Sequence, residues 1–157
     1  SLNKYVQQDE KIIYLSPKGT KFTQEMAKSF LKEKTINIIC GHFEGVDQRV
    51  IESRNIEEIS IGDFILSGGE LALLPIMDAI LRFYPGVLGN DSSCMEESFS
   101  NGLLEYPKYT RPPVACGLEV PSVLSSGHHE NVEKWREEQS LMMTKRYRPD
   151  LLRESKK

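Results

Sequence analysis

Short apolar runs alternate with amphipathic segments over the first half of the chain. Residues 11–15 (KIIYL), 36–40 (INIIC) and 59–66 (ISIGDFIL) have the length and composition of buried strands. Between them, residues 23–33 place apolar side chains at helical spacing behind a threonine that can cap a helix, and residues 46–54 fit a short helix. Strands that alternate with helices predict a mostly parallel sheet in an α/β fold.

Turn residues bound these segments. Residues 16–19 (SPKG) predict a turn directly after the first strand. Residues 69–84 predict a helix with apolar side chains around most of its circumference, and such a helix is either buried or placed at a subunit interface. Pro75 falls near the first turns of this helix, where proline is better tolerated than in the middle, and Pro85-Gly86 ends it.

The second half of the chain has a different pattern. Residues 89–102 are polar with little periodicity and predict a long loop. Residues 107–127 contain four prolines and two glycines, which excludes a regular helix. Residues 131–145 predict an amphipathic helix, and residues 148–150 (RPD) end it and can start another. The apolar side of the 131–145 helix is expected to consist of Val132, Trp135, Leu141 and Met142.

Composition narrows the class of protein. The 157 residues suffice for one domain, or one domain with a small appendage, and 39% hydrophobic with 27% charged residues is typical of a soluble globular chain. No apolar run reaches about 18 residues, so the sequence predicts no membrane span. Cys40, Cys94 and Cys116 have no paired spacing. They are expected to be buried thiols rather than disulfides or metal ligands, which fits a reducing cytosol.

The net charge of −3 is unevenly distributed. The first 105 residues carry 10 basic and 16 acidic side chains, whereas residues 128–157 carry 8 basic and 6 acidic ones. The densest basic cluster is Lys145-Arg146-Tyr147-Arg148. Two interpretations remain open for this cluster: a docking place for a polyanion, or the solvated face of a helix.

Two glycine-containing runs follow predicted strands. They are residues 40–47 (CGHFEGVD) and residues 60–70 (SIGDFILSGGE). Gly68 and Gly69 remove every side chain from a strand-to-helix turn, so that backbone N–H and C=O groups can contact a ligand directly. A glycine pair also serves a bare tight turn or a helix start. Two such loops at neighbouring strand ends nevertheless predict a pocket lined by backbone.

These two runs are part of a wider resemblance. The chain resembles the bacterial tRNA (guanine-N1)-methyltransferases of the TrmD type, in motifs that follow one another in order and with matching spacing over nearly its whole length. The motifs occupy residues 41–49, 60–70, 82–89, 109–112 and 120–129. That family belongs to the SPOUT methyltransferases. The resemblance therefore implies a mostly parallel α/β sheet with a deep trefoil knot, followed by a small helical C-terminal part.

The same resemblance implies a function and a domain organisation. The expected activity is S-adenosylmethionine-dependent methylation of guanine N1 in tRNA at position 37, the guanosine 3′ of the anticodon. The enzyme is expected to be a cytoplasmic homodimer that builds each active site from two subunits. Residues 1–88 would form the knotted cofactor-binding domain, residues 89–106 an interdomain loop and residues 107–157 a helical tRNA-binding part. By this comparison the family's N-terminal segment is absent and its C-terminal domain is shortened.

The resemblance also assigns a cofactor site to three loops. Apolar side chains there can bury the faces of an adenine, and backbone groups of glycine-lined loops can read its edge, as small-ligand sites require. Taken singly, Leu15, Ile61 and Leu66 have a plainer interpretation as strand core. The expected cofactor-binding residues are Tyr14, Leu15, Ser16, Pro17, Gly41, Phe43, Glu44, Gly45, Ile61, Gly62, Phe64, Leu66, Gly68 and Gly69.

Two catalytic residues follow from the same motifs. Guanine N1 must lose its proton, and a carboxylate with a reference pKa of about 4 needs help from burial and from a cation that stabilises charge on the base. In this family an Asp takes the proton and an Arg steadies the guanine O6. The Arg corresponds to Arg82 and the Asp position falls on Glu97, one methylene longer. Glu96 and Asp91 remain alternatives for the base.

Other classes of function compete with this one. A non-enzymatic RNA-binding module that uses the basic C-terminal end is the main alternative. A different nucleotide-binding α/β enzyme ranks lower, because neither a P-loop nor a Gly-x-Gly-x-x-Gly motif occurs. His128 and His129 lack metal-ligand spacing and are interpreted as polar loop groups. Trp135 is expected to pack against its helix.

Overall fold

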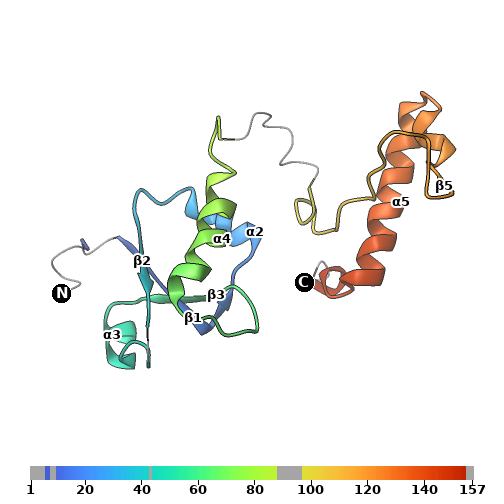
Figure 1. Ribbon diagram of the computed structural model, residues 1–157. Helices are drawn as coiled ribbons and strands as arrows, with labels where there is room; N and C mark the ends of the chain where they lie inside the picture. The colour runs from blue at the N-terminus through green and yellow to red at the C-terminus, as the bar shows by residue number, and fades with distance from the viewer. Residues whose placement is uncertain (1–5, 8–9, 43, 88–96, 155–157) are drawn as a thin grey trace. The chain divides into compact units, whose positions relative to one another are not determined.

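The computed structural model describes residues 6–7, 10–42, 44–87 and 97–154 (Figure 1). The chain divides into two compact units, Ser1–Asp91 and Ser92–Lys157. In the described part of the chain no helix combines the length and the apolar character needed to cross a lipid bilayer. Residues 89–96 of the predicted interdomain loop lie outside the described residues.

A three-stranded parallel sheet is the centre of the first unit. Strand β1 (Lys11–Lys21) lies between β2 (Ile36–Cys40) and β3 (Glu57–Ser60), as Figure 1 shows. Residue Ile13 of β1 pairs with Ile38 of β2 on one side and with Glu57 of β3 on the other. The predicted α/β class with a parallel sheet is confirmed.

Helices cover both faces of this sheet. Successive side chains of a strand point to opposite faces, and those of β1 do so. Ile13 and Leu15 pack with helices α2 (Gln24–Phe30) and α4 (Gly69–Leu81), whereas Ile12 and Tyr14 pack with Ile51 of helix α3 (Gln48–Ser53). The unit therefore has three layers, with the strand ends free to form a site.

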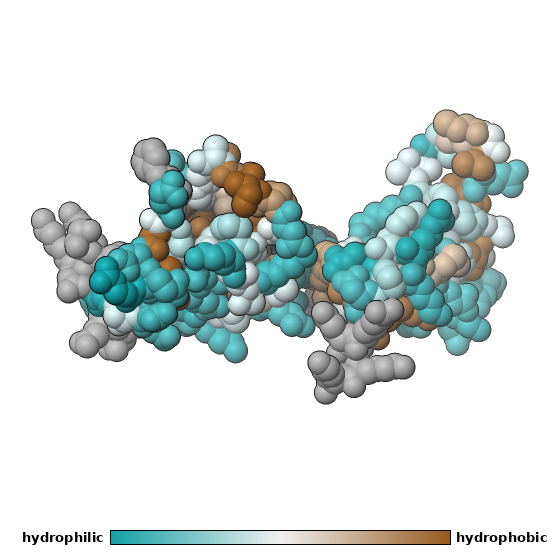
Figure 2. All heavy atoms as spheres, turned by 90° about the horizontal axis from the view of Figure 1, so that it is seen from below, coloured by the Kyte–Doolittle hydropathy of each residue, from teal (hydrophilic) through white to brown (hydrophobic). Residues whose placement is uncertain are grey.

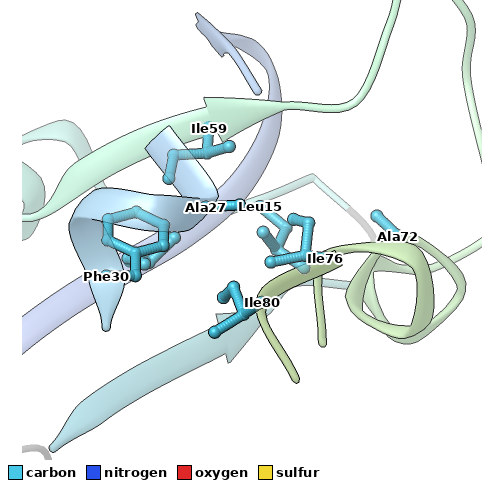
Figure 3. Packing of buried hydrophobic residues seen from close by; sticks show 8 residues of the cluster. Leu15, Ala27, Phe30, Ile59, Ala72, Ile76 and Ile80 are labelled. Carbon is cyan, nitrogen blue, oxygen red and sulfur yellow. The ribbon is translucent and has the colours of Figure 1, made fainter. Parts of the chain in front are cut away.

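The larger core lies between the sheet and helices α2 and α4. Figure 3 shows Ile76 and Ile80 of α4 directed toward Leu15 of the sheet and toward Ala27 and Phe30 of α2. Burial of such side chains is the main favourable contribution to folding.

Thr23 caps the N-terminus of helix α2: its hydroxyl accepts a hydrogen bond from the Met26 N–H at 3.2 Å. This is the arrangement predicted for a capping threonine.

Two predicted strand boundaries are wrong. Strand β1 continues through residues 16–19, where a turn was expected, and its register with β3 changes between Leu15 and Thr20. Strand β3 ends at Ser60 instead of Leu66. The Ser60 hydroxyl accepts from the Gly62 N–H and donates to the Gly62 carbonyl, and Gly62 has φ +154°. This local turn ends the ladder, although the residues after it are apolar.

Helix α4 has one buried and one exposed face. Ala72, Ile76 and Ile80 are buried, whereas Leu71, Leu74, Met77 and Leu81 are exposed, Leu74 by 65%. The helix therefore is not buried all round within this unit. Hydrophobic side chains also reach the surface of the first unit in Figure 2.

The second unit consists mainly of helix α5 (His129–Tyr147), which is longer than the predicted 131–145. It is preceded by a hairpin of β4 (Val114–Ala115) and β5 (Leu118–Glu119) and by the 3₁₀ helix η2 (Ser122–Ser125). It is followed by the short helix α6 (Leu151–Glu154), which starts after Pro149 and Asp150 as expected. No α-helix occurs in residues 107–127, as predicted.

The buried side of α5 differs from the predicted apolar side. Leu141 and Met142 are exposed, whereas the buried residues of α5 are Ser140 and Thr144. The reason is a polar contact. The Thr144 hydroxyl donates to the Ser140 carbonyl at 2.7 Å and accepts from the Leu104 N–H at 2.9 Å. These bonds attach the segment 97–106 to α5. The attached side of α5 carries Ser140 and Thr144 and is opposite to the apolar side predicted from hydrophobicity.

Cysteine burial was also predicted incorrectly in part. Cys40 at the end of β2 is half-buried, but Cys116 is exposed at the turn of the β4–β5 hairpin, where its φ is +54°. Both are free thiols. Cys94 lies outside the described residues.

Candidate functional site

A cavity of about 350 Å³ lies where the carboxyl ends of the three parallel strands meet. This edge is where open α/β sheets bind ligands, because the loops that leave the strands converge there. Its walls come from the end of the first half of β1, the loop after β2, the loop after β3 and the first turn of α4. The volume falls in the range of small-molecule sites, about 300–1,000 Å³.

The cavity gathers residues from all three predicted cofactor loops. Of the fourteen predicted residues, Phe43 lies outside the described residues. The predicted residues that line the cavity are Tyr14, Leu15, Ser16, Pro17, Gly41, Glu44, Gly45, Ile61, Gly62, Phe64, Leu66, Gly68 and Gly69.

Further residues line the same cavity without having been predicted. Six are direct neighbours of predicted ones, whereas Ile59 of β3 and Ala72 of α4 are apolar residues whose character indicated core only. For five of them, the signal that could have found them is their place inside the glycine-containing runs 40–47 and 60–70. They are Lys18, His42, Val46, Ile59, Ser60, Ile65, Ser67 and Ala72.

Close backbone approach explains two of the glycines. A Cβ on Gly69 would lie 2.8 Å from the Cα of Cys40, which is shorter than such contacts allow. A Cβ on Gly41 would lie 2.8 Å from a ring carbon of Tyr14. The loop after β2, the start of α4 and the Tyr14 ring therefore pack without space for side chains at these positions.

Charged groups beside the cavity are paired. The His42 Nε2–H donates to Oε1 of Glu70 at 2.7 Å. The pKa of Glu70 lies below its ordinary value, because its carboxylate accepts from its own backbone N–H and from His42. Burial raises the pKa of the Cys40 thiol, and the negative charge of Glu70 adds to that effect.

The two predicted catalytic residues lie in separate units. Arg82 is half-buried at the C-terminal end of α4, where its N–H bonds the Asp78 carbonyl at 3.0 Å, and it does not line the cavity. Glu97 belongs to the second unit and is half-buried. Glu96 and Asp91, the alternatives for the base, lie outside the described residues.

Glu97 lines a second cavity of about 230 Å³ between the segment 97–106 and α5. The Ser98 hydroxyl accepts from the Glu105 N–H, so the turn that carries Glu97 is closed by side-chain bonds. On the other wall, the Arg136 guanidinium stacks 4.9 Å from the Tyr106 ring centre and bonds Glu133. Trp135 is half-buried and packs against Tyr109 of the preceding segment, with ring centres 6.2 Å apart.

Comparison with known proteins identifies the family. The family model described as tRNA (guanine-1)-methyltransferase TrmD matches residues 1–154. The chain belongs to the TrmD family. The family predicted from the motifs is therefore confirmed.

Curated relatives agree with this assignment. The chain is 54% identical to a tRNA (guanine-N(1)-)-methyltransferase of Pelagibacter ubique over 100% of the chain and 69% of that relative. It is 55% identical to a protein of the same description from Clostridium botulinum over 91% of the chain and 59% of the relative. A Bartonella bacilliformis relative of that description is 56% identical over 88% of the chain and 60% of its own length. The chain thus spans about three-fifths to two-thirds of these TrmD relatives.

Proposed function

We propose that this TrmD family member transfers a methyl group from S-adenosylmethionine to N1 of guanine 37 in tRNA. One observation carries the proposal: all but one of the residues predicted for the cofactor, which come from three separate loops, line one cavity at the carboxyl edge of the sheet. The names of the curated relatives support the reaction.

The residues of the cavity fit this cofactor. Leu15, Ile61 and Leu66 supply apolar surface for the faces of an adenine, and Gly68 and Gly69 leave backbone groups exposed for its polar edge. When bound, S-adenosylmethionine supplies a methyl group on a positively charged sulfur. Glu44 is exposed at the cavity and offers a carboxylate to that charge or to the cofactor's amino group.

The substrate guanine needs a base and a cation from the protein. We propose that the Glu97 carboxylate takes the N1 proton and that the Arg82 guanidinium binds O6, where negative charge develops as the proton leaves. Glu97 carries one methylene more than the aspartate of the family pattern. The closed turn over Ser98 and Glu105 supports the role, since it fixes the backbone from which this longer side chain extends.

The exposed face of α4 supports assembly into a homodimer. Leu71, Leu74, Met77 and Leu81 form one apolar face of a helix that begins at the cavity and ends at Arg82. Contiguous exposed apolar surface of this kind is typical of protein–protein contacts. We propose that a second copy covers this face and that each active site takes residues from both subunits.

The family assignment carries three finer proposals. The loops that meet at the cavity would form the deep trefoil knot of SPOUT methyltransferases. The close approach of Gly69 to the Cys40 backbone fits such chain crossing. The knotted domain would occupy residues 1–88 and the tRNA-binding part residues 107–157, with residues 89–106 between them. Bacterial tRNA is modified in the cytoplasm, which is therefore the proposed location.

Cofactor binding is tested directly by calorimetry with S-adenosylhomocysteine, a stable product of the proposed reaction. Saturable binding to the folded protein is expected. Replacement of Leu66 by Glu should abolish it while the fold is kept, because Leu66 is a partly exposed residue on the cavity wall. Absence of binding by the folded wild-type chain at high concentration would contradict the cofactor proposal.

Methyl transfer is tested with radiolabelled S-adenosylmethionine and unmodified tRNA that carries G37. Glu97→Gln is expected to abolish transfer, because an amide cannot accept the N1 proton, while S-adenosylhomocysteine still binds. Glu97→Asp is the matched variant and should retain activity. Unchanged turnover in Glu97→Gln would move the base elsewhere, and salt-dependent tRNA binding without transfer by the wild type would favour an RNA-binding module.

A further inference from the structure

The loop after β2 and the first turn of α4 are joined by a pair of contacts, and the two residues of the second contact, His42 and Glu70, lie outside the predicted cofactor set. The Gly69 N–H donates to the Gly41 carbonyl at 3.2 Å. One residue further along each segment, the His42 imidazole bonds the Glu70 carboxylate at 2.7 Å. One contact joins the backbones and the other joins the side chains of adjacent residues, so together they fix both the distance and the orientation of the two segments.

The packing around this pair leaves little freedom. A Cβ on Gly68 would lie 2.7 Å from Oε2 of Glu70 and 3.0 Å from Cε1 of His42. The two side chains therefore lie directly over the Gly68 backbone, and a side chain at position 68 would push them apart. Gly68 is a wall of the cavity, as are Gly41, His42 and Gly69. The pair thus lies on the backbone that would contact the cofactor.

We propose that His42 and Glu70 are positioning residues that hold the loop after β2 against the start of α4 and thereby set the width of the cofactor cavity. This inference rests on the proposed function. The pair is referred to below as the His42–Glu70 clasp.

Exposure of the clasp points to positioning rather than to stability. The side chains of His42 and Glu70 are 53% and 55% exposed. Exposed ion pairs contribute little to the free energy of unfolding, because both groups are well solvated when apart. A change in loop position, in contrast, acts directly on cofactor affinity, since misplaced walls lose contacts with the ligand. Loss of the clasp is therefore expected to lower affinity while leaving the melting temperature nearly unchanged.

A double-mutant cycle on S-adenosylhomocysteine affinity tests the clasp. His42→Ala and Glu70→Ala should each weaken binding about five-fold, on the order of 1 kcal/mol. The double variant should be no weaker than either single variant, because both remove the same contact. His42→Gln should restore most of the affinity, since its amide N–H can donate to Glu70 from a similar place.

The matched control is the Gln48–Glu52 pair of α3. It is also an exposed side-chain hydrogen bond of the first unit, at 3.2 Å, and neither residue lines the cavity. Alanine at both positions should leave affinity unchanged. Equal losses in the two cycles would show a general effect of surface substitution and would overturn the proposal.

A second readout needs no cofactor. The carboxyl titration of Glu70, followed by NMR, should move to higher pH in His42→Ala, because one of its two hydrogen bonds is lost while its own backbone N–H remains. Within the described residues, Glu70 is coupled electrostatically to His42 and to the Cys40 thiol. The Gly69 amide should exchange faster with solvent in the same variant, since its bond to Gly41 loses support.

The two readouts separate this inference from the proposed function. If the wild-type protein binds no S-adenosylhomocysteine, the cofactor proposal fails. In that case the Glu70 titration and the Gly69 exchange rate still decide whether the clasp holds the two loops together. If the wild type binds and the single-variant losses simply add, the clasp is overturned even where the cofactor site stands. Unchanged Glu70 titration and Gly69 exchange in His42→Ala would overturn it in either case.

Discussion

At the scale of the residue, the two described cysteines differ in exposure, and the surroundings of Cys40 change the pKa of its thiol. Cys116 is exposed at a hairpin turn, while Cys40 is half-buried at the end of β2 and has its pKa raised by burial and by Glu70. The thiolate is the reactive form. We expect maleimide at neutral pH to label Cys116 well before Cys40, as measured by peptide mass mapping over time.

The sign of the pH effect follows from the same cause. A raised pKa means that Cys40 gains thiolate only at higher pH, so the labelling rate of Cys40 should rise as the solution becomes more alkaline. Cys116→Ser is the control that removes the fast phase. Equal labelling rates at neutral pH would show that the end of β2 is open to solvent.

At the scale of the element, packing of α4 on the sheet depends on Ile76. Its side chain is fully buried among Leu15, Ala72 and Ile80 (Figure 3). Ile76→Ala should destabilise the protein by about 2–5 kcal/mol, because it removes buried methylene groups and leaves a cavity. Chemical denaturation measures this loss. Lys32→Ala, at an exposed position, is the control and should change the free energy of unfolding little. If Ile76→Ala lowers the free energy of unfolding no more than this control does, α4 is held by other contacts.

The link between α5 and the segment that carries Glu97 depends on Thr144. Its fully buried hydroxyl accepts from the Leu104 N–H. Thr144→Val keeps the shape but leaves that N–H without its acceptor, so the Leu104 amide should exchange with solvent at least ten-fold faster, a penalty of about 1–3 kcal/mol. Thr144→Ser keeps the hydroxyl and should preserve slow exchange. Slow exchange in Thr144→Val together with fast exchange in Thr144→Ser would assign the effect to the methyl group instead of the hydroxyl.

Periodicity predicted elements well where hydrophobic burial decides the structure. Strands β1 and β2 and helices α2 and α3 fall where apolar spacing indicated them. It failed where polar contacts decide. The Ser60–Gly62 bonds end β3 before an apolar stretch, and the Thr144 hydroxyl turns a polar side of α5 inward. Such bonds depend on partners distant in sequence or on local backbone geometry, neither of which a hydrophobic pattern contains.

The candidate site was predictable for a different reason. Two glycine-containing runs predicted a pocket lined by backbone, because glycine permits close backbone approach, and the resemblance to the TrmD family implied the individual residues. The pairing of His42 with Glu70 joins residues 28 positions apart. No spacing rule connects them, so this contact required the folded chain.

At the scale of the whole molecule, the charge of the two halves differs in a way that suits a polyanionic substrate. The acidic excess lies in the first 105 residues, and the basic cluster Lys145-Arg146-Tyr147-Arg148 ends α5 in the second unit. Phosphate contacts by lysine and arginine give sequence-independent affinity that falls with salt. This distribution fits the proposed tRNA contact through the second unit, while the first unit has the cavity proposed for the cofactor.

Shared active sites make a quantitative prediction about mixed dimers. If each site takes Arg82 from one subunit and Glu97 from the other, a dimer of Arg82→Ala with Glu97→Gln has one site without either group and one intact site. Random mixing of the two inactive proteins should then restore about a quarter of the wild-type activity, because half of the dimers are mixed and each has one working site of two. Methyl transfer to tRNA, measured after joint refolding of the two variants, gives the restored fraction of activity.

Each variant refolded alone is the control and should stay inactive. If one subunit supplies both groups, every site in the mixture lacks one of them and no activity returns. That result would leave the homodimer possible but would place Arg82 and Glu97 of a single chain in the same site.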